Sequence, residues 1–175
     1  IQPETPEMTD VTKNTDMGLL PLPSSAERER VTGKGRVLSI LCVHDNPMFL
    51  DRICRYLERE GDLSVDISIS AEDALHLMRY VLFDVVVTDY TLGQKTNNSL
   101  LKAVRGQGNP VPFIYFTRTR NTGVDAEASR YGAVSFVEWE GKSPARGFGE
   151  LYQSILRAAA GDGKGSEPQN GVLVR

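Results

Sequence analysis

The sequence predicts an α/β protein built on a doubly wound, five-stranded parallel sheet with helices on both faces. Two observations lead to this prediction. Between residues 36 and 160, apolar strand-like runs alternate five times with segments whose apolar residues follow helical spacing. The run at 85–87 is three valines, as expected for a strand in the middle of a sheet that is covered on both faces. A region of this length can bury one hydrophobic core without disulfides or metals.

The first two strand–helix units have clear local signals. The first helix has a proline suited to its first turn, an asparagine that can cap it and a glycine that stops it. The second strand alternates apolar and polar residues, which is typical of a half-covered or edge strand. Ser70 lies three residues before Asp73, close to a capping box. We therefore expect strands at 36–43 and 63–68, and helices at 47–60 and 70–81.

The remaining units follow the same pattern. The strand at 112–116 has its proline at the first position, where a strand tolerates it. The helix at 124–131 has few apolar residues and is ended by Gly132. Further helices are expected around 100–104 and 148–156, with strands at 85–87 and 134–137.

The two ends of the chain are predicted to be tails. Four prolines interrupt residues 1–35, whose single short apolar patch is too small to repay the entropy of ordering. Residues 161–175 begin with a glycine-rich run that is typical of a flexible linker. We expect a disordered or extended segment at 1–35, a folded domain at 36–160 and a flexible tail or linker at 161–175. The chain does not begin with methionine, which is consistent with a piece of a longer protein.

Composition disfavours several functional classes. The net charge of −3 gives no basic surface for nucleic acid. No apolar run approaches the roughly 18 to 20 residues that span a bilayer, and no signal peptide is recognisable. The two cysteines are too few for a disulfide scaffold, so we expect free thiols and a cytoplasmic protein.

Polar residues follow the strands where a sheet of this kind places its binding site, beyond the carboxyl ends. Asp45 follows the first strand, Asp89 the third and Thr117 the fourth. Two carboxylates and a loop carbonyl suit Mg²⁺. A carboxylate beside a bound cation can attack a phosphoryl group, and a threonine hydroxyl can hydrogen-bond a transferred phosphoryl oxygen.

These residues resemble the receiver domain of two-component response regulators. The resemblance covers residues 36–160 and implies the flavodoxin-like topology of that family. The strands at 85–87 and 112–116 are also similar to those of receivers from methanogenic archaea. The matching stretches are 40–47, 70–75, 83–90, 112–117 and 132–133.

The resemblance implies a role for several residues. Asp89 matches the aspartate that accepts a phosphoryl group. Asp45 matches a direct Mg²⁺ ligand, and Thr91 matches the position whose backbone carbonyl completes the metal site. Thr117 matches the switch hydroxyl, and Phe136 matches the aromatic residue that moves with it.

The family's function follows from the same resemblance. It implies phosphorelay signalling rather than an enzyme with its own substrate. A histidine kinase or histidine phosphotransfer protein would donate the phosphoryl group. The output would pass to a downstream protein or an attached domain, without direct contact to nucleic acid or membrane. The face built by the fourth helix, fifth strand and fifth helix would meet partners, including a second copy in a homodimer.

Two departures from the family pattern make the active site degenerate. His44 stands where the family has its first acidic residue, and Trp139 stands where it has a lysine. A charge-assisted hydrogen bond is worth about 1.5–3 kcal/mol against about 1 kcal/mol for a neutral one, so we expect weaker Mg²⁺ binding and slower phosphorylation. Lys95 or Lys142 could substitute for the missing lysine.

Two alternatives remain open besides a phosphoaccepting receiver. The first is a pseudo-receiver, which uses the fold for protein interaction without phosphorylation. The second is an unrelated enzyme on a similar sheet. An aspartate-based phosphatase would need a second aspartate at position 91, which is threonine, and the first strand is not followed by a phosphate-binding P-loop.

Overall fold

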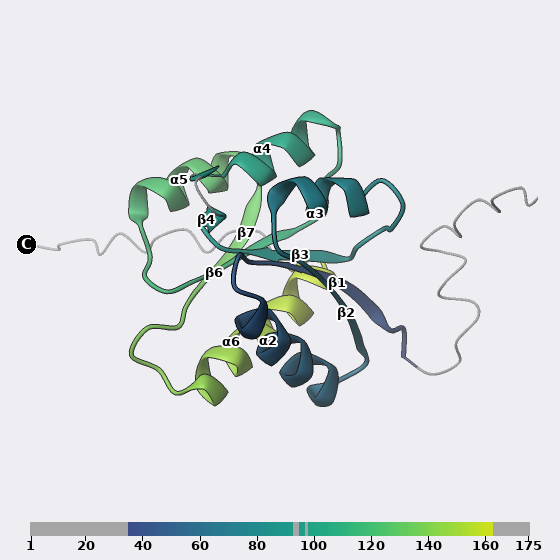
Figure 1. The fold of residues 1–175 in the computed structure, drawn as a ribbon, viewed down its shortest axis with the longest axis vertical. Helices are drawn as coiled ribbons and strands as arrows, with labels where there is room; N and C mark the ends of the chain where they lie inside the picture. Colours follow the sequence, from purple (N-terminus) through teal and green to yellow (C-terminus); the bar gives the residue numbers. More distant parts are fainter. Residues whose placement is uncertain (1–34, 93–94, 97, 163–175) are drawn as a thin grey trace, which may run out of the picture. The chain divides into compact units, whose positions relative to one another are not determined.

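The strand order in a computed structural model reverses between two central neighbours, β1 and β3, which creates the crevice expected of a doubly wound sheet (Figure 1). The structure describes residues 35–92, 95–96 and 98–162. Its five-stranded parallel sheet has the order β2-β1-β3-β6-β7. The bounds of these strands are β1 Leu38–Val43, β2 Leu63–Ser68, β3 Val85–Thr88, β6 Phe113–Thr117 and β7 Ala133–Glu138.

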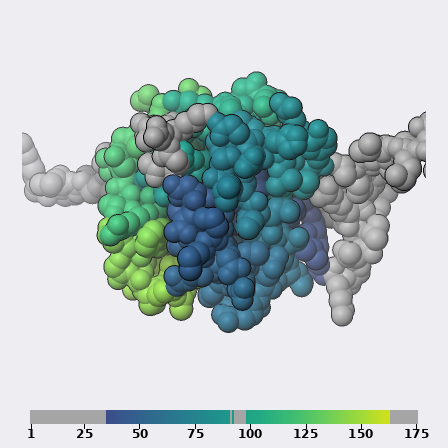
Figure 2. Space-filling model, in the orientation of Figure 1, coloured from purple at the N-terminus to yellow at the C-terminus, as the bar shows by residue number. Residues whose placement is uncertain are grey.

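Helices cover both faces of this sheet (Figure 1). Two helices, α2 and α6, lie side by side on one face and are neighbours on the molecular surface (Figure 2). Three helices, α3, α4 and α5, pack on the other face. The bounds of the helices are α2 Pro47–Glu60, α3 Ala71–Leu77, α4 Ser99–Gly106, α5 Thr122–Arg130 and α6 Pro144–Ala159. The predicted fold class is confirmed.

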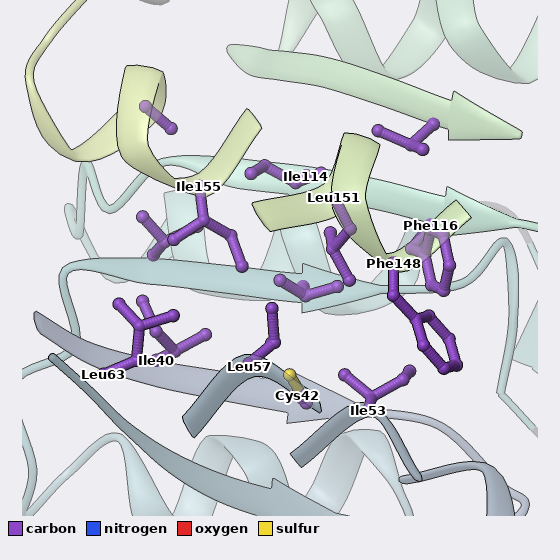
Figure 3. Close-up of a cluster of buried hydrophobic side chains, with 14 of the residues drawn as sticks. Ile40, Cys42, Ile53, Leu57, Leu63, Ile114, Phe116, Phe148, Leu151 and Ile155 are labelled. Carbon is purple, nitrogen blue, oxygen red and sulfur yellow. The ribbon is translucent and has the colours of Figure 1, made fainter. Parts of the chain in front are cut away.

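Each face of the sheet has its own hydrophobic cluster. The α2 and α6 side contains Leu50, Ile53 and Leu151, all almost completely buried. Figure 3 shows this cluster, with Phe116 and Phe148 together near the carboxyl ends of the strands. All four residues of β3 are buried, as the valine run predicts for a central strand.

The capping predictions are also confirmed. The side chain of Asn46 accepts hydrogen bonds from the backbone N–H groups of Met48 and Phe49, at 3.0 and 3.2 Å. Ser70 accepts one from the N–H of Asp73 at 3.1 Å. These caps orient the first turns of α2 and α3, which begin directly after strands.

The structure differs from the sequence predictions in several places. Helix α3 ends at Leu77 instead of continuing to residue 81, and α6 begins earlier, at Pro144, because Ser143 caps it. Ile67 is 47% exposed and Leu156 is 36% exposed, although their spacing predicted buried faces. Ile67 lies on β2, which is an edge strand of the sheet.

A further difference is a short antiparallel pair of strands after β3. Its strands are β4 (Thr91–Leu92) and β5 (Lys95–Thr96). The predicted tails at 1–35 and 161–175 lie almost entirely outside the described residues and stay predictions. No helix in the described part of the chain has the length and apolar character needed to cross a membrane.

Candidate functional site

The carboxyl edge of the sheet brings Asp45 and Asp89 toward each other. Strands β1 and β3 are hydrogen-bonded neighbours in which Val43 pairs with Thr88, so the residues that follow emerge side by side. The Asp89 side chain is only 14% exposed, whereas that of Asp45 is 51% exposed. The Asp89 carboxylate is therefore largely buried, and the Asp45 carboxylate is exposed to solvent.

His44 lies between the two carboxylates. Its Nδ1 is 3.2 Å from Asp45 Oδ1, and its Nε2 is 3.7 Å from Asp89 Oδ2. The backbone N–H of Asn46 donates to Nδ1 at 3.0 Å. Because that bond uses the Nδ1 lone pair, we assign the ring proton to Nε2, which faces Asp89. The residue that replaces the family's first acid thus presents an N–H group to Asp89 where an acid would present oxygen.

The two oxygens of Asp89 have different surroundings. Oδ1 accepts a hydrogen bond from the backbone N–H of Tyr90 at 2.7 Å. Oδ2 accepts no hydrogen bond from the residues that the structure describes, with His44 Nε2 at 3.7 Å. Of the two, Oδ2 is therefore the oxygen with fewer hydrogen-bond partners among the described residues.

Thr117 lies at the end of β6, the other neighbour of β3. Its hydroxyl is buried and donates to the backbone carbonyl of Thr119 at 3.3 Å. The role of Thr117 as the switch hydroxyl stays a prediction.

Trp139 is packed into an aromatic cluster instead of projecting freely. Its ring centroid is 5.4 Å from that of Phe49 and 6.5 Å from that of Phe116. Phe49 in turn contacts the His44 ring, at 4.7 Å between centroids. The indole Nε1 is buried and has no hydrogen-bond partner among the described residues. Trp139 therefore fills space beside the acidic edge, by which we mean the end of the sheet that carries Asp45 and Asp89. It supplies no charge there.

The proposed substitutes for the missing lysine can be placed only in part. Lys142 Nζ is 2.5 Å from Glu150 Oε2, so its charge is engaged by an acid on α6. The side chain of Lys95 lies outside the described residues, as does that of Thr91, whose backbone belongs to β4.

A second set of side chains, which the sequence did not single out, joins the acidic edge to α5. The Tyr90 hydroxyl donates to the buried Asp125 carboxylate, and Arg120 bonds the same carboxylate at 2.6 and 2.8 Å. The Arg120 guanidinium lies 5.3 Å from the centre of the Phe136 ring, which stacks on Tyr115. Tyr115 also contacts the Tyr90 ring, at 5.3 Å. An aspartate on an otherwise weak helix was the only sequence signal for this network.

The acidic edge offers two carboxylates as Mg²⁺ ligands, Asp45 and Asp89, and lacks the third acid of the family pattern. Mg²⁺ needs only one or two protein carboxylates when it keeps several waters, and Asp45 and Asp89 can supply these. His44 adds no oxygen. Within residues 35–92, 95–96 and 98–162, no group of three or more His, Cys, Asp or Glu side chains could hold a metal ion.

The parallel sheet of order β2-β1-β3-β6-β7, with an aspartate after each of its two central strands, defines a receiver-type signalling domain. The chain belongs to the response regulator receiver domain family, whose model matches residues 40–142.

Curated relatives agree with this assignment. The transcriptional regulatory protein MalR of Bacillus subtilis is 28% identical over 102 residues, covering 58% of this chain and 43% of the relative. The transcriptional regulatory protein DltR of Streptococcus agalactiae is 30% identical over 99 residues, covering 54% of this chain and 44% of the relative. The match thus spans less than half the length of these relatives. The similarity to archaeal receivers stays a prediction.

Solved structures share the fold. A two-component response regulator of the LuxR family from Aurantimonas has a TM-score of 0.64 and 25% identity, covering 71% of this chain and 86% of that chain. The receiver domain of the Francisella response regulator 1452 has a TM-score of 0.62 and 21% identity, covering 71% of this chain and 98% of that chain.

Proposed function

We propose that this receiver domain, at residues 36–160, accepts a phosphoryl group on Asp89 from a histidine kinase or a histidine phosphotransfer protein. The observation that carries the proposal is the arrangement at the carboxyl edge of the sheet. There, Asp89 Oδ2 accepts no hydrogen bond from the described residues, His44 Nε2 lies 3.7 Å from it, and Asp45 lies on the other side of the His44 ring. A largely enclosed carboxylate with an oxygen that is not hydrogen-bonded by the described residues can act as a nucleophile toward phosphorus.

In the proposed step, Asp89 Oδ2 attacks the phosphorus of a phosphohistidine. The new O–P bond forms as the P–N bond breaks, and the donor imidazole leaves with the bonding electron pair and takes up a proton. The N–H of Tyr90 holds Asp89 Oδ1 at 2.7 Å and so fixes the orientation of the carboxylate. His44 Nε2–H is placed to hydrogen-bond an oxygen of the incoming group.

A bound Mg²⁺ would neutralise charge on the phosphoryl oxygens. Asp45 and Asp89 would hold it, together with the backbone carbonyl of Thr91 that the family pattern implies. Since His44 contributes no oxygen, we expect weak Mg²⁺ affinity and slow phosphorylation.

Phosphorylation would change the partner-binding face through movements of Thr117 and Phe136. If the Thr117 hydroxyl rotates toward the phosphoryl group, its hydrogen bond to the Thr119 carbonyl would break. The rotation would also free space beside β6. Phe136 is the aromatic residue of the adjacent β7, and it lines an open groove of about 730 Å³ between β7 and α6. Charged residues, among them Arg120 and Glu138, also line this groove, which suits a protein partner or a second copy of the chain.

The output would be carried by another domain or another protein in the cytoplasm. The relatives MalR and DltR are named as transcriptional regulatory proteins and are more than twice as long as the matched region. The net charge of −3 argues against direct DNA binding by the chain itself. We propose no separate enzymatic activity.

The test is intact mass after incubation with a small phosphoramidate, with and without Mg²⁺. We expect one phosphoryl adduct that depends on Mg²⁺ and disappears in Asp89→Asn. Asp66→Asn, an exposed aspartate on β2, is the matched control and should keep the adduct. If the folded wild-type chain forms no adduct, the pseudo-receiver alternative replaces this proposal. If the adduct survives in Asp89→Asn, the nucleophile is a different residue.

A further inference from the structure

A small cavity lies between α2, α6 and the loop that joins β7 to α6. Its volume is about 140 Å³, and its walls include the rings of Phe49, Trp139 and Phe148. These rings come from three separate parts of the chain. An apolar cavity of about 150 Å³ is large enough to bind benzene. The cavity therefore has the size and the walls for one aromatic ring.

The charged residues that line this cavity are both basic. Its lining includes Arg52 and Lys142 and no acidic side chain. Lys142 is paired with Glu150, but Arg52 forms no ion pair with any residue that the structure describes. The Arg52 guanidinium lies over the Phe148 ring, 6.0 Å from its centre. Arg52 is exposed on α2, so its charge is available to an anion at the mouth of the cavity.

The cavity shares a wall with the acidic edge. Phe49 lines the cavity and also contacts the His44 ring, at 4.7 Å between centroids. The other side of His44 faces Asp89. A ring that enters the cavity would press on Phe49 and thus alter the environment of His44.

Gly147 keeps this space available. A Cβ atom at position 147 would lie 3.2 Å from the Cβ of Trp139, closer than nearly all such contacts. The glycine therefore allows Trp139 to approach α6 closely, and Trp139 lines the cavity.

We propose that this cavity binds a small aromatic carboxylate, with the ring between Phe49, Trp139 and Phe148 and the carboxylate on Arg52. The site is separate from Asp89 and does not depend on its phosphorylation. A bound ligand would alter the environment of Asp89 through the contacts of Phe49 with His44 and of His44 with Asp89.

The full chain can be tested with benzoate as the probe. Trp139 is the only tryptophan and its ring lines this cavity, so its fluorescence and its single indole N–H resonance respond to a ligand that enters. We expect a saturable change in both, with a dissociation constant on the order of 1 mM for a ligand of this size. Benzyl alcohol and acetate, which lack the charge or the ring, should bind at least tenfold more weakly.

Two arginine variants separate specific binding from general attraction of anions. Arg52→Gln should weaken benzoate binding about tenfold. Arg55→Gln, on the same helix but outside the cavity and paired with Asp51, should leave it unchanged. Both positions are exposed, so neither variant should affect folding. Equal effects of the two variants, equal binding of acetate, or a change that does not saturate would overturn the proposal.

Discussion

The hydroxyl of Tyr90 donates a hydrogen bond to the buried carboxylate of Asp125. This bond ties the residue that follows Asp89 to helix α5, 35 positions further along the chain. Arg120 completes the contact by bonding the same carboxylate and lying over Phe136. The position of α5 is thus linked directly to the loop that carries the proposed phosphoacceptor.

Tyr90→Phe should lower the free energy of unfolding by about 1–3 kcal/mol, because it leaves a buried carboxylate with one partner fewer. Urea denaturation gives the measurement. Tyr80→Phe is the control, since Tyr80 is 57% exposed and should change stability by less than about 0.5 kcal/mol. Equal stability of the two variants would show that the Tyr90 bond contributes nothing. Combining Tyr90→Phe with Asp125→Asn should give a non-additive result.

Stability should fall as the pH rises above 10, the ordinary pKa of tyrosine. Burial, followed by the hydrogen bond to Asp125, raises the pKa of Tyr90, and burial also raises the pKa of Tyr115. The folded state therefore keeps protons that the unfolded state releases, so the stabilisation is complete below pH 10 and is lost above it. Ultraviolet titration should show these tyrosines ionising after the exposed ones. Ionisation of all six tyrosines together near pH 10 in the folded protein would contradict this.

His44→Asp should strengthen Mg²⁺ binding about tenfold or more. The substitution adds a carboxylate oxygen beside Asp45 and Asp89, and charge-assisted contacts are worth about 1.5–3 kcal/mol. Trp139 fluorescence during a Mg²⁺ titration provides the measurement, since Phe49 lies between position 44 and Trp139. The control is His76→Asp, on the distant helix α3, which should bind as the wild type does. No gain in His44→Asp would mean that the acidic edge does not bind the ion.

Phe49→Ala should lower the free energy of unfolding by about 2–3 kcal/mol, somewhat below the usual 3–5 kcal/mol because the ring is only partly buried. It removes the ring that contacts His44, Phe116 and Trp139 together. Met48→Ala, at the preceding and 80% exposed position, should have almost no effect. Thermal denaturation of the two variants decides the comparison, and a similar loss in both would show that the aromatic cluster is not a stabilising unit.

The sequence by itself determined the sheet and the location of the candidate site. Strand and helix periodicities differ, and caps such as Asn46 and Ser70 act over two or three residues, so local patterns were enough to place most elements. Parallel strands direct their carboxyl ends to one edge. That rule predicts that Asp45, Asp89 and Thr117 lie at the same edge of the sheet.

Only the tertiary structure decided what surrounds these residues. It placed His44 Nε2 opposite Asp89, joined Tyr90 to Asp125 and packed Phe49 against Trp139. Each contact joins residues that are distant in sequence, and each depends on side-chain orientations that no local pattern encodes. Helix–sheet packing sets those orientations, which is why the roles of Tyr90, Asp125 and Phe49 could not be derived from the sequence.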